Sequence, residues 1–371
     1  MDRTPVEFLP WIDLTNWKRQ DRLPGLSILR SPSFDRQRIE ALKRTEGIPV
    51  VVVFPVRGDE ELPTLEREIQ ILEPLRGGLI DEIWIVFGGN AEAETPRMAS
   101  RKGVFIHYDN EIPVDHGGGG PSGKGRAMRG MIHHLCTRRG LRHPRAIIQF
   151  LDGDIREQYF HPGWVIDPVG AILWFQELEV AKIVYHRPWG GRLNAFAAAL
   201  VSIFDHPGLR SLSRLVYLLS GEIAATLRFW LSAPFRENQG VEIQLLTALA
   251  FNQIQLRNGE ADLDHVIQVY VGEMDHQHKP LRSSRVRKGL DAMAKEVFQT
   301  FLENLVRRDW LRLNPPLRFS DRLRLTIMDH PGEGGNESVI HLEWPSGEKT
   351  LPPLKTLPEV RASCPWLMEN S

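Results

Sequence analysis

Residues 146–154 read AIIQFLDGD. The first six are uncharged and mostly apolar, which is the pattern of a strand buried on both faces. The run ends in Asp152-Gly153-Asp154, whose two carboxylates lie on one side of an extended chain, while the glycine between them lets a ligand approach the backbone. Carboxylate oxygens bind hard divalent cations, and such a cation often coordinates substrate phosphate oxygens at the same time. The stretch therefore predicts a metal and phosphate site at a strand end, with a plain Asp-Gly turn as the alternative interpretation.

Comparable apolar runs precede this one. IPVVVVFP at 48–55, LIDEIWIVF at 79–87 and GVFIHY at 103–108 alternate with helical patterns over 60–75 and 124–138. This rhythm predicts an α/β domain with a mostly parallel sheet, right-handed crossovers and ligands beyond the carboxyl ends of the strands. Further strands are expected at 181–185 and 266–271, and further helices at 193–205, 212–219, 222–231 and 241–252.

Composition excludes several classes of protein. The chain has 371 residues, with 46 Lys and Arg against 47 Asp and Glu, so it lacks the positive field of a dedicated nucleic-acid binder. Two cysteines cannot build a disulfide framework, and their sparing use indicates a reducing, cytoplasmic setting. No signal peptide and no apolar run of spanning length is present, which predicts no integral membrane segment. A homodimer is compatible with this composition.

The two ends of the chain differ from the middle. Residues 1–47 are expected to form an N-terminal extension packed on the main domain. Residues 283–371 are expected to form a C-terminal extension, with a basic helical stretch at 285–308 and a β-hairpin whose strands are 323–328 and 338–344. A proline-rich tail should follow as surface coil.

Other motifs carry charged side chains to helix starts or loops. GGGGPSGKG at 117–125 is not a Walker A motif, but Lys124 at a helix start is placed to meet an anion. His276 and His278 alternate within DHQHKP, as metal ligands or simply as part of a polar loop. Glu222 and Glu242 each open an expected helix, where complementing the helix dipole is the default role.

The order of these motifs is more specific than any one of them. A strand ending at Pro55, then G-K-G, D-x-D, G-G-R, PFRENQGVEIQL at 234–245 and HQHKPL at 276–281 resembles the retaining GT-A glycosyltransferases of the glucosyl-3-phosphoglycerate synthase family and the related mannosyl-3-phosphoglycerate synthases. The resemblance covers roughly 48–281. It implies a GT-A domain over 48–282, with a nucleotide-sugar half at 48–155 and an acceptor half at 156–282.

The resemblance also implies residue roles. It assigns the nucleotide sugar to Pro55, Val56, Arg57, Asp59, Gly88, Lys124, Asp152, Gly153, Gln239 and Glu242, and Mg²⁺ or Mn²⁺ to Asp154 and His276. The acceptor falls to Gly190, Gly191, Arg192, Asn194 and His278. The resemblance assigns catalytic roles to three groups. Lys124 would contact the diphosphate, Glu242 would orient the sugar hydroxyls, and the Leu219 carbonyl would face the reacting sugar.

One segment and three single positions depart from the family pattern. The family has D-S-G-S where this chain has Phe87-Gly88-Gly89-Asn90, tyrosine in place of Gln239, threonine in place of Asn194 and asparagine in place of His278. These departures bear on the nucleotide and on the acceptor.

The resemblance implies transfer of glucose or mannose from UDP-glucose, GDP-glucose or GDP-mannose. The acceptor would be a small anionic molecule such as 3-phosphoglycerate or glycerate. The transfer would retain the anomeric configuration, and no carboxylate would act as nucleophile. Two alternatives stay open: a polyprenyl-phosphate sugar transferase that uses 285–308 as a membrane-facing helix, and a non-catalytic sugar-nucleotide binder.

Overall fold

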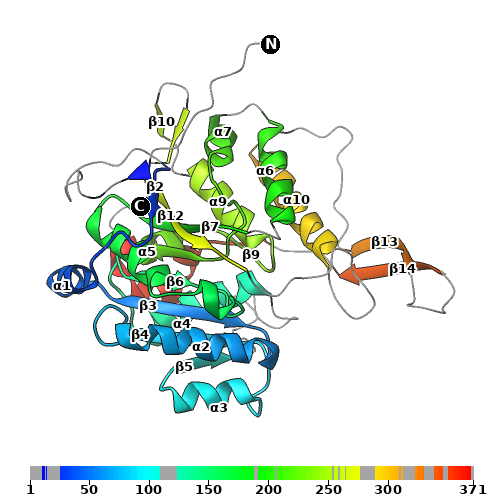
Figure 1. Cartoon of the computed structure of the whole chain (residues 1–371). Coiled ribbons are helices and arrows are strands. Elements are labelled where there is room, and N and C mark those ends of the chain that lie inside the picture. Colours follow the sequence, from blue (N-terminus) through cyan, green and yellow to red (C-terminus); the bar gives the residue numbers. More distant parts are fainter. Residues whose placement is uncertain are drawn as a thin grey trace.

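The structure is a computed structural model of the whole chain (Figure 1). It describes residues 11–12, 14, 26–108, 123–187, 191–204, 207–252, 255–257, 260–263, 265–275, 289–308, 311, 322–329, 338–345 and 350–368. Within this part of the chain, no helix is both long enough and apolar enough to cross a membrane.

A nine-stranded sheet forms the centre, in the order β1-β2-β12-β7-β8-β6-β3-β4-β5. The strands of this sheet are β1 Trp11–Ile12, β2 Ile28–Arg30, β3 Val50–Val56, β4 Glu82–Phe87, β5 Phe105–Tyr108, β6 Ile147–Phe150, β7 Val180–His186, β8 Ile223–Thr226 and β12 Val266–Glu273. Every pairing is parallel except the two made by β8, which lies antiparallel between β6 and β7. The expected α/β class and mostly parallel sheet are confirmed.

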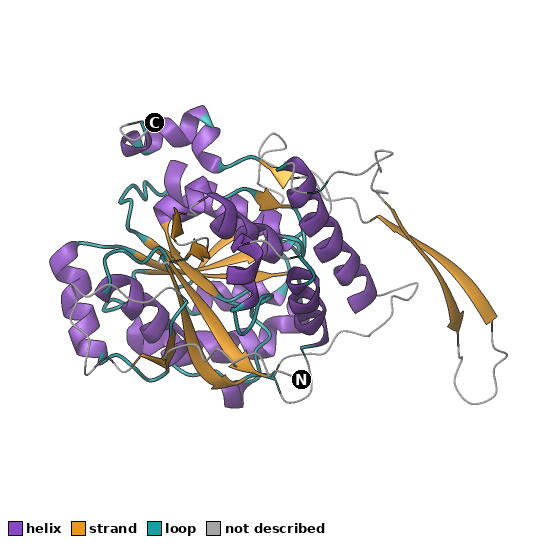
Figure 2. Cartoon of the chain, turned by 90° about the horizontal axis from the view of Figure 1, so that it is seen from above, coloured by secondary structure: helices purple, strands orange, loops and turns teal. Residues whose placement is uncertain are grey.

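Helices cover both faces of the sheet (Figures 1 and 2). One apolar core gathers side chains of α1 (Arg36–Glu46), α2 (Leu62–Leu72), α3 (Glu94–Arg101) and α5 (Gly163–Trp174). The opposite core gathers the remaining helices: α4 (Lys124–Thr137), α6 (Arg192–Ser202), α7 (Pro207–Ser213), α8 (Leu227–Ser232), α9 (Val241–Asn252), α10 (Leu290–Arg307) and α11 (Pro358–Ser363). Strand residues alternate between the two cores, as a sheet buried on both faces requires.

Smaller elements complete the molecule. Antiparallel pairs join β10 (Gln255–Arg257) to β11 (Glu260–Asp262), β13 (Arg322–Asp329) to β14 (Ser338–Pro345), and β9 (Phe235–Arg236) to β15 (Thr350–Leu351). Short 3₁₀ turns lie at Asp59–Glu61, Glu73–Leu75, Glu157–Tyr159, Leu354–Thr356 and Pro365–Leu367. The β13–β14 hairpin confirms the expected strands and extends away from the rest of the chain (Figure 2).

Two expected helices are wrong. Residues 222–231 form strand β8 followed by the short helix α8, and helix α7 ends at Ser213, so that 214–222 is an irregular loop. The residues Ile223-Ala224-Ala225 are locally compatible with a helix. In the structure they pair with β6 and β7 and are buried, and this pairing favours the extended backbone over the helix.

The expected surface coil at the C-terminus is also wrong. Leu354, Val360 and Cys364 are fully buried in the core that contains α4, and Arg129 of α4 donates to the Pro352 carbonyl. Apolar side chains spaced this widely have no helical or strand period, although they fill gaps between helices once the domain has formed.

Candidate active site

The predicted nucleotide edge is formed by β3 and β6, which run side by side. Leu151 donates its N–H to the Val53 carbonyl at 3.0 Å, so Pro55–Asp59 and Asp152–Asp154 leave the sheet together. Thr64 of α2 donates its hydroxyl to the Gly153 carbonyl at 2.7 Å. A Cβ at Gly153 would lie 3.3 Å from side-chain carbons of both Val56 and Leu65, which leaves little room for any residue but glycine. The two segments therefore share one edge, as predicted.

Asp59 and Gly88 stand at the same edge. The Asp59 carboxylate accepts hydrogen bonds from the Thr95 hydroxyl at 2.7 Å and from the N–H groups of Glu94 and Thr95, and these bonds lower the pKa of Asp59. Asp59 thereby fixes the start of α3 against the turn that follows β3. Gly88 donates its N–H to the Val56 carbonyl at 2.9 Å, and both Gly88 and Arg57 are exposed.

Lys124 joins three segments that are far apart in the sequence. It begins α4, and its Nζ donates to Asp152 Oδ1 at 2.6 Å and to Glu242 Oε1 at 3.0 Å. Burial alone would lower the pKa of Lys124, but the surrounding carboxylates outweigh it and raise the pKa well above its ordinary value. The ammonium is therefore held charged between the D-x-D motif and the first turn of α9.

The glycines beside Lys124 let its helix pack against the segment that leads into α9. A Cβ at Gly125 would overlap the Arg236 carbonyl oxygen and lie 2.9 Å from Val241 Cβ. Arg126 donates its N–H to the Glu237 carbonyl at 3.0 Å. Close backbone packing thus explains the G-K-G spacing, and it brings Gln239, which is half-buried, to the same side of the molecule.

A second buried layer lies behind Lys124. Glu222 is 1% exposed and accepts from the Tyr185 hydroxyl at 3.2 Å. Burial, with repulsion from Asp152, raises the pKa of Glu222 to about 7. Lys182 is 2% exposed, and burial lowers its pKa to about 8. Sequence reasoning gave Glu222 only a helix-dipole role and missed Lys182, although a lone lysine inside the apolar strand VAKIVY was a signal.

Asp154, the expected metal ligand, lies near two further carboxylates, Glu61 and Glu68. Burial and repulsion from Asp154 raise the pKa of Glu61 to about 7 and the pKa of Glu68 well above its ordinary value. Glu68 Oε2 is buried and has no hydrogen-bond partner among the residues that the structure describes. Such crowding of oxygen ligands fits a hard cation. His276 lies outside the described residues, among which no three ligands converge into a complete metal site.

The residues expected to bind the acceptor include those at the start of α6. Gly191 has φ of 86°, a left-handed conformation that favours glycine, and Arg192 follows it exposed to solvent. Arg187, which sequence reasoning missed, donates to the Tyr217 hydroxyl at 3.4 Å beside this turn. The side-chain oxygen of Asn194 accepts hydrogen bonds from the backbone N–H groups of Leu218 and Leu219. Gly190 and His278 lie outside the described residues.

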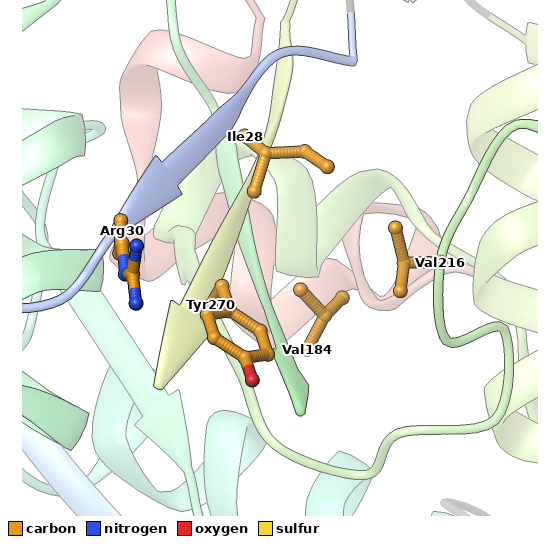
Figure 3. Close-up of a pocket in the computed structure, with 5 residues that line it drawn as sticks. All are labelled: Ile28, Arg30, Val184, Val216 and Tyr270. Atoms are coloured by element: carbon orange, nitrogen blue, oxygen red, sulfur yellow. The ribbon is translucent and has the colours of Figure 1, made fainter. Parts of the chain in front are cut away.

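A hollow of about 380 Å³ opens near this region (Figure 3). It is lined by Ile28, Arg30, Val184, Val216 and Tyr270. Val184, Arg30 and Tyr270 come from the paired strands β7, β2 and β12, whereas Val216 reaches it from the 214–222 loop. None of these residues was predicted to be part of a site.

A mostly parallel sheet with one inserted antiparallel strand, a D-x-D motif at a strand end and a buried lysine beside it define a GT-A glycosyltransferase. The solved structures agree. The chain superimposes on glucosyl-3-phosphoglycerate synthase from Mycobacterium tuberculosis in complex with Mn²⁺, UDP and phosphoglyceric acid, with a TM-score of 0.68, 26% identity and coverage of 90% of this chain and 99% of that one. The complex of the same protein with Mn²⁺, UDP-glucose and phosphoglyceric acid gives a TM-score of 0.67, also at 26% identity.

Curated relatives confirm the resemblance to the glucosyl-3-phosphoglycerate synthases. The protein of that name from Petrotoga mobilis is 29% identical over 334 residues, covering 86% of this chain and 90% of its own. The one from Mycolicibacterium paratuberculosis is 27% identical over 359 residues, covering 91% and 94%. No family model matches the chain.

Proposed function

We propose that this chain is a metal-dependent retaining glucosyltransferase that moves glucose from UDP-glucose to 3-phosphoglycerate. The placement of Lys124 carries the proposal, because its ammonium lies between Asp152 at the nucleotide edge and Glu242 on α9. Nucleotide strand, cationic group and sugar-side carboxylate thus meet at one point. The relatives named glucosyl-3-phosphoglycerate synthase support this choice of donor and acceptor.

The chemistry requires stabilisation of a departing diphosphate. Lys124 supplies a positive charge that is already oriented and largely shielded from water, and such a charge stabilises developing negative charge strongly. When bound by Asp154 and His276, Mg²⁺ or Mn²⁺ would neutralise further charge on the leaving phosphates. Glu242 would orient the sugar hydroxyls, while Asp152 and Glu242 together hold the lysine in place.

Retention of the anomeric configuration is what the resemblance to the retaining glucosyl-3-phosphoglycerate synthases implies, and we include it in the proposal on that ground. Glu242 is bound to Lys124, so we assign it no covalent role. The acceptor hydroxyl would attack on the face from which UDP leaves, and Arg192 would hold the acceptor's anionic group through a bidentate contact. The Leu219 carbonyl would face the sugar at the reacting carbon, where positive charge develops.

The test is UDP release and product formation from UDP-glucose and 3-phosphoglycerate with Mg²⁺ or Mn²⁺. GDP-glucose, GDP-mannose and glycerate serve as alternative substrates in the same assay. We expect the UDP-glucose and 3-phosphoglycerate pair to give the highest kcat/KM. A higher value with a GDP donor or with glycerate would reassign the substrate, and no transfer with any pair would refute the proposal.

The membrane alternative loses its main support. Helix α10, which lies within the basic stretch 285–308, turns Val297, Phe301 and Leu305 into the core rather than toward a lipid surface. We propose a cytoplasmic location, because both cysteines are buried and form no disulfide, as is usual in reducing compartments. Fractionation of cells that express the tagged chain would test this location.

A further inference from the structure

The loop 214–222 is held by side chains from other elements. It links α7 to β8 and crosses beside Lys124 without a helix or strand of its own. Val216 donates its N–H to Gln268 Oε1 at 2.7 Å, and Gln268 is fully buried in β12. Buried backbone groups outside regular structure need such partners, because leaving them unpaired costs free energy.

Asn194 holds the middle of this loop. Its Oδ1 accepts from the Leu218 N–H at 2.7 Å and from the Leu219 N–H at 3.2 Å. An amide oxygen has two lone pairs, so both are in use. The oxygen of Asn194 is thus committed to the loop backbone. This differs from the acceptor contact that the resemblance assigns to this position.

Lys182 holds the next residue from the opposite side. Its buried Nζ donates to the Ser220 carbonyl at 2.9 Å, and the Ser220 hydroxyl donates to the Ile183 carbonyl at 2.7 Å. Burying an ammonium is costly unless it is hydrogen-bonded and compensated by opposite charge, which Glu222 and Glu242 provide. A lysine retained at such a position points to a requirement for that contact.

The Leu219 carbonyl lies between these two anchors. Within the described residues, no hydrogen bond is made to its oxygen. Two residues further on, Gly221 packs directly against the Lys124 ammonium. The loop therefore holds the Leu219 carbonyl two residues before the glycine that packs against Lys124, and a dipole fixed in advance costs no reorganisation during reaction.

We propose that Asn194 and Lys182 are positioning residues that hold the Leu219 carbonyl in place for sugar transfer. The inference rests on the proposed function for its catalytic meaning, whereas the holding of the loop stands on the hydrogen bonds alone. Neither residue needs to touch the substrate.

Asn194→Leu and Asn194→Asp separate positioning from acceptor binding. Leucine removes the amide oxygen, so we expect kcat to fall at least tenfold while the KM values for donor and acceptor change less than threefold. Aspartate keeps an oxygen for both N–H groups, so its kcat should stay within about threefold of the wild type. Ser202→Ala, an exposed change on the same helix, is the matched control. An unchanged kcat with a raised acceptor KM in Asn194→Leu, or equal losses of kcat in both variants, would overturn the proposal.

Lys182→Met and amide hydrogen exchange supply a readout that does not depend on activity. Methionine keeps the length of the side chain and removes its donor. We expect faster exchange in peptides spanning 214–222 for Asn194→Leu and Lys182→Met, with Asn194→Asp and Ser202→Ala like the wild type. Unchanged exchange in both of the first two variants would refute the anchoring. If the wild type exchanges slowly there but transfers no glucose, the proposed function fails while the anchoring stands.

Discussion

Replacing Gly221 with alanine should disable Lys124 while leaving the fold intact. The new Cβ would overlap Lys124 Nζ and lie 2.9 Å from Cε and 3.0 Å from Glu242 Oε1, whereas nonbonded carbon contacts settle near about 3.5 Å. The backbone of Gly221 is not in the left-handed region, so alanine adds no strain there. The flexible lysine end must move instead, by about 1 Å or more. A displacement of about 1 Å costs on the order of 100-fold in rate, or about 2.7 kcal/mol.

Steady-state transfer from UDP-glucose to 3-phosphoglycerate measures this loss, with thermal unfolding as the stability control. The decisive comparison is a double-mutant cycle with Lys124→Ala. If Gly221→Ala acts by moving the ammonium, it should add almost nothing once the ammonium is gone. Full additivity of the two losses, or a large fall in Tm for Gly221→Ala alone, would refute the reasoning.

Three further predictions follow from the site. Asp154→Ala should lose nearly all turnover and EDTA should silence the wild type, with Mg²⁺ or Mn²⁺ restoring only the latter; turnover that survives both treatments would exclude the metal role. Arg192→Ala should raise the acceptor KM at least about tenfold with little change in donor KM, because a charged hydrogen bond contributes about 1.5–3 kcal/mol; unchanged acceptor kinetics would move that site elsewhere. Burial raises the pKa of Glu222 from 4.5 to about 7, so the native state holds its proton more tightly and the unfolding free energy should fall as pH rises from 4.5 to 7. Glu222→Gln should lessen that fall by on the order of 1–3 kcal/mol in urea unfolding, and identical slopes for variant and wild type would contradict the assignment.

The strands that frame the donor site could be predicted, but the element at the centre of the sheet could not. β3 and β6 are mostly Val, Ile and Phe, a composition that favours a strand buried on both faces, so their position is largely a local property. β8 reads IAAT, which contains no such preference. Its extended form comes from antiparallel pairing with β6 and β7, which are distant in the sequence.

The same contrast holds for the side chains of the site. The Asp152–Asp154 pair can be predicted as a candidate site from the sequence, because two carboxylates directly follow an apolar strand. The lone lysine in an apolar strand marks Lys182 as unusual and the resemblance marks Asn194, but neither indicates that these side chains bind backbone atoms of Ser220, Leu218 and Leu219. A loop with few constraints of its own takes its shape from whatever packs around it.

By itself, the sequence determined the apolar strands β3, β4, β5 and β6 and the charged residues that follow them, because apolar periodicity and turn chemistry act over a few residues. Only the tertiary structure decided that Lys124 meets Asp152, 28 residues away, and Glu242, 118 residues away. It also decided that the C-terminal segment enters the core rather than lying on the surface. Such contacts depend on how the sheet orders its strands and how helices pack across them, and no local pattern encodes that order.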